Sequence, residues 1–247
     1  MTDTPSIQFL CPPELEGRIP APERAGKSMP DWFRALPREM GMADEHGLPG
    51  LTVRACLPVA DAMSLGWTLP LPVDVTAATD PATGALRFHW AADAPWAPLG
   101  THHPGQIGAD APPGAGNPFS GFSPMKFMNP WRVVLPAGWS AMFLHPLNHF
   151  ELPFRTFGGA VDCDALDVAV NMPFLWTAGE AHLPAGTPIA QVVPYDRAAM
   201  RLPATARAET GDEAKRREAI YTRKHSEVSV YAREWRRRHE RRHDLPD

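Results

Sequence analysis

The clearest pattern lies between residues 126 and 200, where short apolar runs follow one another between prolines and glycines. The runs occupy residues 131–136, 139–146, 154–162, 166–176, 181–186 and 188–195. Short strands at regular spacing with such punctuation are typical of a sandwich or a barrel. We therefore expect a mostly-β protein whose core, a compact barrel or sandwich, covers residues 126–200.

The first 125 residues are richer in loops, and we expect this N-terminal loop-and-hairpin region (1–125) to pack on the core. Residues 73–90 are predicted to form a β-hairpin, because apolar residues alternate with polar ones on both sides of the turn sequence DPATG. Short helices are expected within 27–37 and 57–66, where Ser28 and Gly66 provide a possible cap and stop. The last part, 92–125, is expected to be a long loop.

Residues 201–247 are expected to form a linker and a charged helix. Neither Gly nor Pro occurs in 212–243, and Ala214, Tyr221, Val228 and Trp235 recur every seven residues. This predicts an amphipathic helix that could break at 225–230, where Ser and β-branched residues lower helix propensity. Its apolar stripe has to be covered, either by its own domain or by a second copy, so a homo-oligomer stays open.

Composition supports this picture and narrows the partners. The 247 residues include 29 prolines, more than double the usual ~5%, which favours strands and turns over helices. Three cysteines without a CxxC motif favour a reduced, cytoplasmic chain. The N-terminus does not look like a signal peptide, and no apolar run reaches the ~18 residues of a membrane span, so no membrane partner is expected.

The C-terminal residues are basic, but their charges are mixed. From residue 212 to the end there are 11 Lys and Arg against 8 Asp and Glu, while the whole chain has a net charge of −4. Interleaved acidic residues favour a solvated helix with internal ion pairs, or an oligomer contact. Nucleic acid is therefore not the expected partner.

Four motifs between residues 132 and 193 resemble those of β-clip proteins related to dUTP pyrophosphatase. In chain order they are LPAGW (135–139), HPLNHF (145–150), GAVDCDALD (159–167) and GTPIAQV (186–192). The resemblance implies a β-clip fold in which Gly186 turns a hairpin and Gln191 is a core amide that serves a neighbouring loop. It also implies that Asp162 corresponds to the carboxylate that orients the attacking water, and that the chain forms an oligomer, because such relatives are trimers.

The departures from that family argue against its reaction. The serine of the second motif is missing, Ala165 stands where the family has a sugar-stacking tyrosine, and the chain has no glycine-rich closing motif. Too few phosphate ligands remain for an active pyrophosphatase.

The chain is also similar, over nearly its full length, to an uncharacterised family of phage and proteobacterial proteins. The segments that carry this resemblance are 20–37, 52–75 and 126–140. It implies no activity that can be transferred.

Three groups of residues are candidates for chemistry. His89, His102 and His103 could bind a metal through neutral imidazoles, or could be incidental residues of a solvated loop. Asp162 and Asp164 could hold a divalent metal or act as a base and its partner, or could stabilise a turn. The second motif and its surroundings form the third group, a ligand-binding candidate comprising His145, Asn148, His149 and Arg155; otherwise this is a packed connection.

The hypotheses on function fall into three classes. The first is a protein that binds a small-molecule or nucleotide-like ligand and is not an active pyrophosphatase, with His145, Asn148, His149, Arg155, Asp162 and Asp164 as ligand contacts. The second is a metal-dependent enzyme that uses the three histidines or the Asp162/Asp164 pair. The third is a structural or oligomeric interaction protein. No cofactor is assigned, and a divalent metal stays open.

Overall fold

The structure is a computed structural model that describes residues 6–45, 47–108, 110–112, 114, 116, 117, 119, 125–228 and 230–236. The described chain is mostly β, with sixteen strands in five antiparallel sheets. The mostly-β prediction is therefore confirmed, together with the N-terminal hairpin and a C-terminal helix. None of the five sheets of described strands closes into a barrel.

The chain divides into two compact units. The β unit comprises Met1–Asp31 and Asp61–Leu202, and the hairpin–helix unit comprises Trp32–Ala60 and Pro203–Asp247. This division differs from the boundaries expected at residues 125 and 200. Strands on both sides of residue 125 pair directly with each other, so they belong to one unit.

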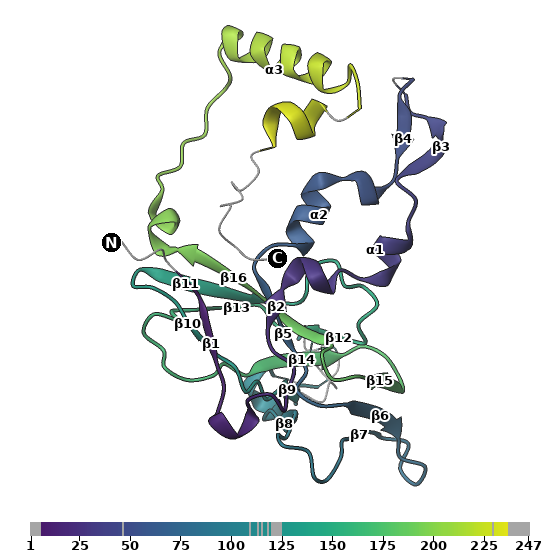
Figure 1. Cartoon of the computed structure of the whole chain (residues 1–247), viewed down its shortest axis with the longest axis vertical. Helices are drawn as coiled ribbons and strands as arrows, with labels where there is room; N and C mark the ends of the chain where they lie inside the picture. The colour runs from purple at the N-terminus through teal and green to yellow at the C-terminus, as the bar shows by residue number, and fades with distance from the viewer. Residues whose placement is uncertain are drawn as a thin grey trace. The chain divides into compact units, whose positions relative to one another are not determined.

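The central sheet of the β unit has five strands (Figure 1). Their order is β13 (Gly159–Val161), β11 (Trp139–Leu144), β16 (Pro188–Asp196), β5 (Trp67–Pro70) and β2 (Glu23–Arg24). The middle strand, β16, is buried at four consecutive residues, 189–192. A strand covered on both faces needs a continuous apolar run rather than an alternating one, and this explains the sequence IAQVV.

The remaining strands of the β unit form three smaller sheets. One contains β12 (Phe154–Thr156), β14 (Met172–Trp176), β9 (Met125–Phe127) and β8 (Leu99–Thr101), and another contains β15 (Ala181–Leu183), β6 (Val75–Thr79) and β7 (Leu86–His89). The predicted hairpin is β6–β7, paired from Thr76 with His89 to Thr79 with Leu86. The pair β1 (Gln8–Leu10) and β10 (Arg132–Val134) completes the set. The expected loop at 92–125 contains one of these strands, β8, so it is not wholly irregular.

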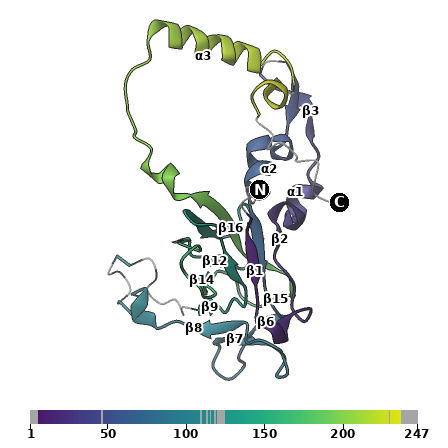
Figure 2. The same cartoon turned by 60° about the vertical axis from the view of Figure 1, so that its left-hand side comes forward.

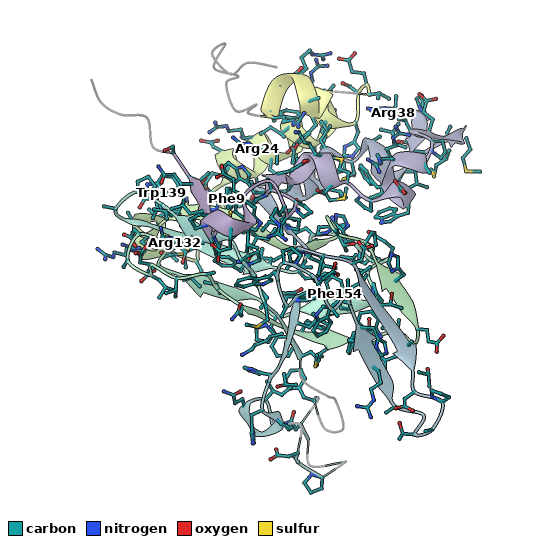
Figure 3. The ribbon with its side chains drawn as sticks, turned by 60° about the horizontal axis from the view of Figure 1, so that its bottom comes forward. Phe9, Arg24, Arg38, Arg132, Trp139 and Phe154 are labelled. Atoms are coloured by element: carbon teal, nitrogen blue, oxygen red, sulfur yellow. The ribbon has the colours of Figure 1, made fainter. Side chains whose placement is uncertain are left out.

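Aromatic residues fill the core between these sheets. The rings of Phe127 and Phe174 stack with their centroids 4.1 Å apart, and Phe154 packs edge-on against Phe127. Phe154 lies in the middle of the β unit (Figure 3) and is completely buried. A large aromatic residue at an inward strand position removes much apolar area from water, which favours these short strands despite their many prolines.

The hairpin–helix unit combines a β-hairpin with helical segments. The hairpin is β3 (Glu39–Ala43) and β4 (Pro49–Leu51), and the unit also contains most of α1 (Asp31–Ala35) and the start of α2 (Leu57–Met63). Short 3₁₀ turns along the chain occupy Pro13–Leu15, Ala25–Ser28, Val53–Ala55, Pro104–Gln106 and Arg197–Arg201. No helix among the described residues is both long enough and apolar enough to cross a membrane.

The C-terminal helix is shorter than the 32-residue pattern predicts. Helix α3 covers Gly211–Lys224, and its first turn is closed by a capping box in which the side chains of Thr210 and Glu213 each accept a bond from the other's backbone N–H. A second helical turn, Tyr231–Trp235, folds back beside the end of α3 (Figures 1 and 2), where Arg223 contacts Glu234. The break falls within the predicted 225–230 segment, and residues 237–243 of the expected helix lie outside the described residues.

Candidate functional site

The polar centre of the β unit is Gln191, which joins β16 to two other segments. The side chain is 1% exposed. Its Oε1 accepts a hydrogen bond from the Leu147 N–H at 2.9 Å, and its Nε2 donates to the carbonyls of Ala62 (2.9 Å) and Leu65 (2.6 Å). The last carbonyls of a helix have no partner within the helix, so Gln191 satisfies the end of α2 while it holds the 145–150 loop.

Two glycines beside the central sheet have a left-handed backbone. Gly66, which follows α2, has a φ of +71°, and a Cβ atom there would lie 2.0 Å from the Val192 carbonyl oxygen. Gly186 has a φ of +89°, and its N–H donates to the Leu71 carbonyl at 2.9 Å in the turn before β16. Both positions need the left-handed backbone that glycine adopts without strain.

The loop at residues 145–150 is held by two histidines. The N–H of Thr156 donates to His145 Nδ1 at 3.4 Å, and His145 Nε2 lies 3.3 Å from the carbonyl oxygen of His149, to which it can donate. This pattern requires a neutral ring with its proton on Nε2. Burial lowers the pKa of His145, and the nearby Arg155 and His149 act in the same direction.

The second histidine of the loop is almost fully buried. His149 Nδ1 lies 2.8 Å from Glu151 Oε1. Asn148 occupies the turn between the histidines with a φ of +62°, the one positive φ among the described non-glycine residues. Asn tolerates this conformation better than most residues, so the turn explains its presence at this position.

Arg155, in strand β12, bonds to the main chain around it. The Arg155 guanidinium donates to the carbonyls of Leu152 (2.8 Å), Phe154 (2.7 Å) and Phe150 (3.4 Å). These bonds occupy three of the five guanidinium N–H groups and orient the side chain towards its own backbone.

The aspartates of the third motif meet an arginine that the sequence analysis did not select. Asp164 accepts two hydrogen bonds from Arg197, at 2.7 and 2.6 Å, and a third from the Gly138 N–H at 2.8 Å. These bonds, those from Arg197 above all, lower the pKa of Asp164 to about 2. Asp162 accepts a bond from the hydroxyl of Ser140 at 2.5 Å and lies 3.5 Å from Arg197.

This arrangement is a clamp that joins the exit of β16 to the turn after β13. A bidentate guanidinium neutralises Asp164 and fills its oxygens, and a carboxylate in that state is a poor ligand for a metal. Asp162 is the more accessible of the two, with its side chain 65% exposed.

The three histidines proposed as metal ligands do not form a ligand set. No group of three or more His, Cys, Asp or Glu side chains within the described part of the chain could hold a metal ion. His103 caps the 3₁₀ turn at Pro104–Gln106, where its Nδ1 accepts from the Gly105 N–H at 3.1 Å. His89 is an exposed residue of β7, opposite Thr76.

A pocket in the hairpin–helix unit is lined by none of these residues. It is a cavity of about 490 Å³ between the β3–β4 hairpin, the segment 55–58 and the chain that follows α3. Apolar side chains form most of its wall: Met40, Leu48, Leu51, Val228, Val230 and Tyr231. Four charged or titratable residues, Asp44, Lys224, His225 and Glu227, also line it, and so does the free thiol of Cys56.

The cavity exists because the chain turns after α3. Arg223 reaches Glu234 Oε1 at 2.5 Å and Glu227 at 3.3 Å, and Glu227 also pairs with Arg233. These ion pairs connect Glu227, Arg233 and Glu234 with the end of α3, and Val230 is buried. The sequence indicated that Val228 and Tyr231 needed cover, but no local pattern connected them with residues 40–58.

No protein-family model matches the chain, and no curated protein matches its sequence significantly.

Proposed function

We propose that this protein binds a small molecule in the cavity of the hairpin–helix unit and is not an active pyrophosphatase. The observation that carries the proposal is the cavity itself. Its volume of about 490 Å³ falls within the ~300–1,000 Å³ typical of ligand pockets, and its mostly apolar wall with a few polar groups is the usual composition of such a site.

The β unit offers less to a ligand. The candidate polar groups of this unit already have hydrogen-bond partners within the chain. Gln191 bonds to two backbone segments, Arg155 donates to three carbonyls, and Asp164 accepts from an arginine. A ligand at this place would have to displace hydrogen bonds that the fold itself uses. We therefore place the ligand in the cavity and assign Gln191, His145 and Asn148 to the stability of the fold.

The cavity can be tested with an uncharged fluorescent probe, N-phenyl-1-naphthylamine. We expect saturable binding by the full chain and at least about tenfold weaker binding by Ala55→Phe, because Ala55 lines the cavity and a benzyl group would fill part of it. Ala206→Phe is the matched control, since Ala206 is exposed and lies outside the cavity. Equal binding by both variants, or no saturable binding by the wild type, would contradict the proposal.

A second measurement does not depend on a substituted protein. Cys56 lies in the cavity wall, whereas Cys163 is buried and Cys11 is half-buried. Burial raises the pKa of both Cys11 and Cys163, which makes their thiols slower to react. N-ethylmaleimide should therefore label Cys56 first, and the bound probe should slow that labelling. Labelling of Cys56 at an unchanged rate with the probe present would argue against this location.

The absence of hydrolysis is a separate prediction. Triphosphate hydrolysis requires several cations or backbone amides directed at the reacting phosphate, and the loss of one such donor typically costs about 10²–10³ in rate. Arg155 and Arg197 are committed to internal partners. Incubation with dUTP or dCTP and Mg²⁺ should release no pyrophosphate above the blank. Release that disappears in Asp162→Ala would restore the enzyme hypothesis.

A further inference from the structure

The charged groups at the cavity differ in whether the chain already uses them. Glu227 accepts hydrogen bonds from Arg233 and Arg223, and Arg233 in particular holds the pKa of Glu227 below its usual range. Asp44 Oδ1 accepts from the Leu48 N–H at 2.9 Å. His225 Nδ1 lies 2.8 Å from the Tyr221 carbonyl oxygen, to which it can donate. These three groups are engaged by the protein itself.

Lys224 is the exception. Its ammonium has no hydrogen-bond or ion-pair partner within the described residues, although it lines the same cavity. It is the last residue of α3, and the negative end of the helix dipole favours a cation there. An ammonium at an apolar wall that has no partner within the described residues offers its charge to an anionic group of a ligand.

We infer that the ligand is an amphipathic anion: an apolar body against Met40, Leu51 and Tyr231, with one acidic group at Lys224. This inference rests on the proposed function, because it assigns a ligand class to the same cavity. A carboxylate, a sulfonate or a phosphate monoester would share this chemistry. A ligand with an apolar body alone would leave Lys224 unused.

The test compares two probes with the same eight-carbon chain length, octanoate with an anionic head group and 1-octanol with an uncharged one. Each is titrated against N-phenyl-1-naphthylamine bound to the full chain, and the readout is the ratio of the two affinities. We expect Lys224→Gln to lower the octanoate-to-octanol ratio about fivefold, and Lys224→Arg to keep it near the wild-type value. Lys215→Gln is the matched control, because Lys215 is an exposed lysine of the same helix that does not line the cavity.

The outcomes separate the two proposals. If the uncharged probe binds but Lys224→Gln leaves the ratio unchanged, the anion inference is wrong and the binding function stands. An equal loss in Lys215→Gln would also overturn it, because the effect would then be one of general charge. If the uncharged probe does not bind saturably, the cavity is not a binding site and the proposed function itself is wrong. The affinity of octyl phosphate, a phosphate monoester, shows whether the cavity prefers a doubly charged head group or a carboxylate.

Discussion

The β unit and the hairpin–helix unit differ in how many of their polar groups are hydrogen-bonded and how much of their apolar surface is buried. In the β unit, buried polar side chains such as Gln191 and Thr156 are bonded to backbone partners, and the aromatic core is closed. In the hairpin–helix unit, α3 has no buried residue, while Met40 and Met42 of the hairpin are exposed. Residues that look reactive can therefore serve the fold, whereas an incompletely covered apolar surface leaves room for a ligand.

The largest expected difference between the units is in hydrogen exchange. Strand β16 is buried and bonded on both sides, by β11 and β5, so its amides should open only with the whole unit. An isolated helix of 14 residues is marginal in water, and α3 buries none of its residues. Amides of 189–193 should exchange at least about 10³-fold more slowly than those of α3 in a mass-spectrometric experiment.

Slow hydrogen exchange of the α3 amides would contradict this comparison and show that something covers the helix. Repeating the measurement at several protein concentrations would then identify the cover. Protection that falls on dilution would point to a second copy, as the predicted homo-oligomer requires, and protection that does not would point to the same chain.

The next largest effect is expected for Gln191→Leu. The substitution leaves the Leu147 N–H and the carbonyls of Ala62 and Leu65 without their partner in a buried place. We expect a loss of about 3 kcal/mol in the free energy of unfolding, measured by urea denaturation. Gln106→Leu is the control, because Gln106 is an exposed cap that bonds the His103 N–H, and its loss should cost no more than about 0.5 kcal/mol. Equal costs at the two sites would mean that Gln191 is peripheral.

The smallest effect concerns acid stability at the Asp164–Arg197 clamp. The pKa of Asp164 is about 2 in the folded protein, against an ordinary value of 3.8, so the unfolded chain binds the proton more readily. The stability from this carboxylate is complete above pH 3.8 and is lost as the pH falls towards 2. Asp164→Asn should therefore be less stable than the wild type at neutral pH, and the difference should shrink between pH 3.8 and 2 in urea melts.

The control for the clamp is Asp93→Asn, which removes an exposed carboxylate of the loop after β7. Its difference from the wild type should stay small at every pH. If the Asp164→Asn difference did not depend on pH, the ion pair with Arg197 would not be the source of the stability.

Much of the fold could be predicted because the signals are local. The hairpin at 73–90 follows from alternation around a Pro- and Gly-containing turn, and the break after α3 falls in the segment where helix propensity drops. The run at 166–176 was expected to be a strand throughout, but only β14, at Met172–Trp176, pairs with neighbours. Pairing needs a partner strand at the right register, and no pattern within one segment supplies that.

The candidate sites were harder to predict, because the partners of a side chain come from elsewhere in the chain. Asp164 was a candidate metal ligand because the sequence does not indicate its partner. In the structure that partner is Arg197, 33 residues later. His103 was a candidate metal ligand because its ring nitrogen has a free electron pair. In the structure that nitrogen accepts a hydrogen bond from the Gly105 N–H and caps a turn. Residue type alone does not separate a binding role from a structural one.

The sequence by itself determined the mostly-β character, the hairpin, the C-terminal helix and the presence of a polar residue in the strand 188–195. These follow from periodicity, turn residues and helix propensity, which act over a few neighbouring residues. Only the tertiary structure decided which polar groups have hydrogen-bond partners within the chain and where a cavity remains. Both depend on contacts between distant segments, such as Gln191 with Ala62, or residues 40–58 with 224–232, and such contacts leave no local signal in the chain.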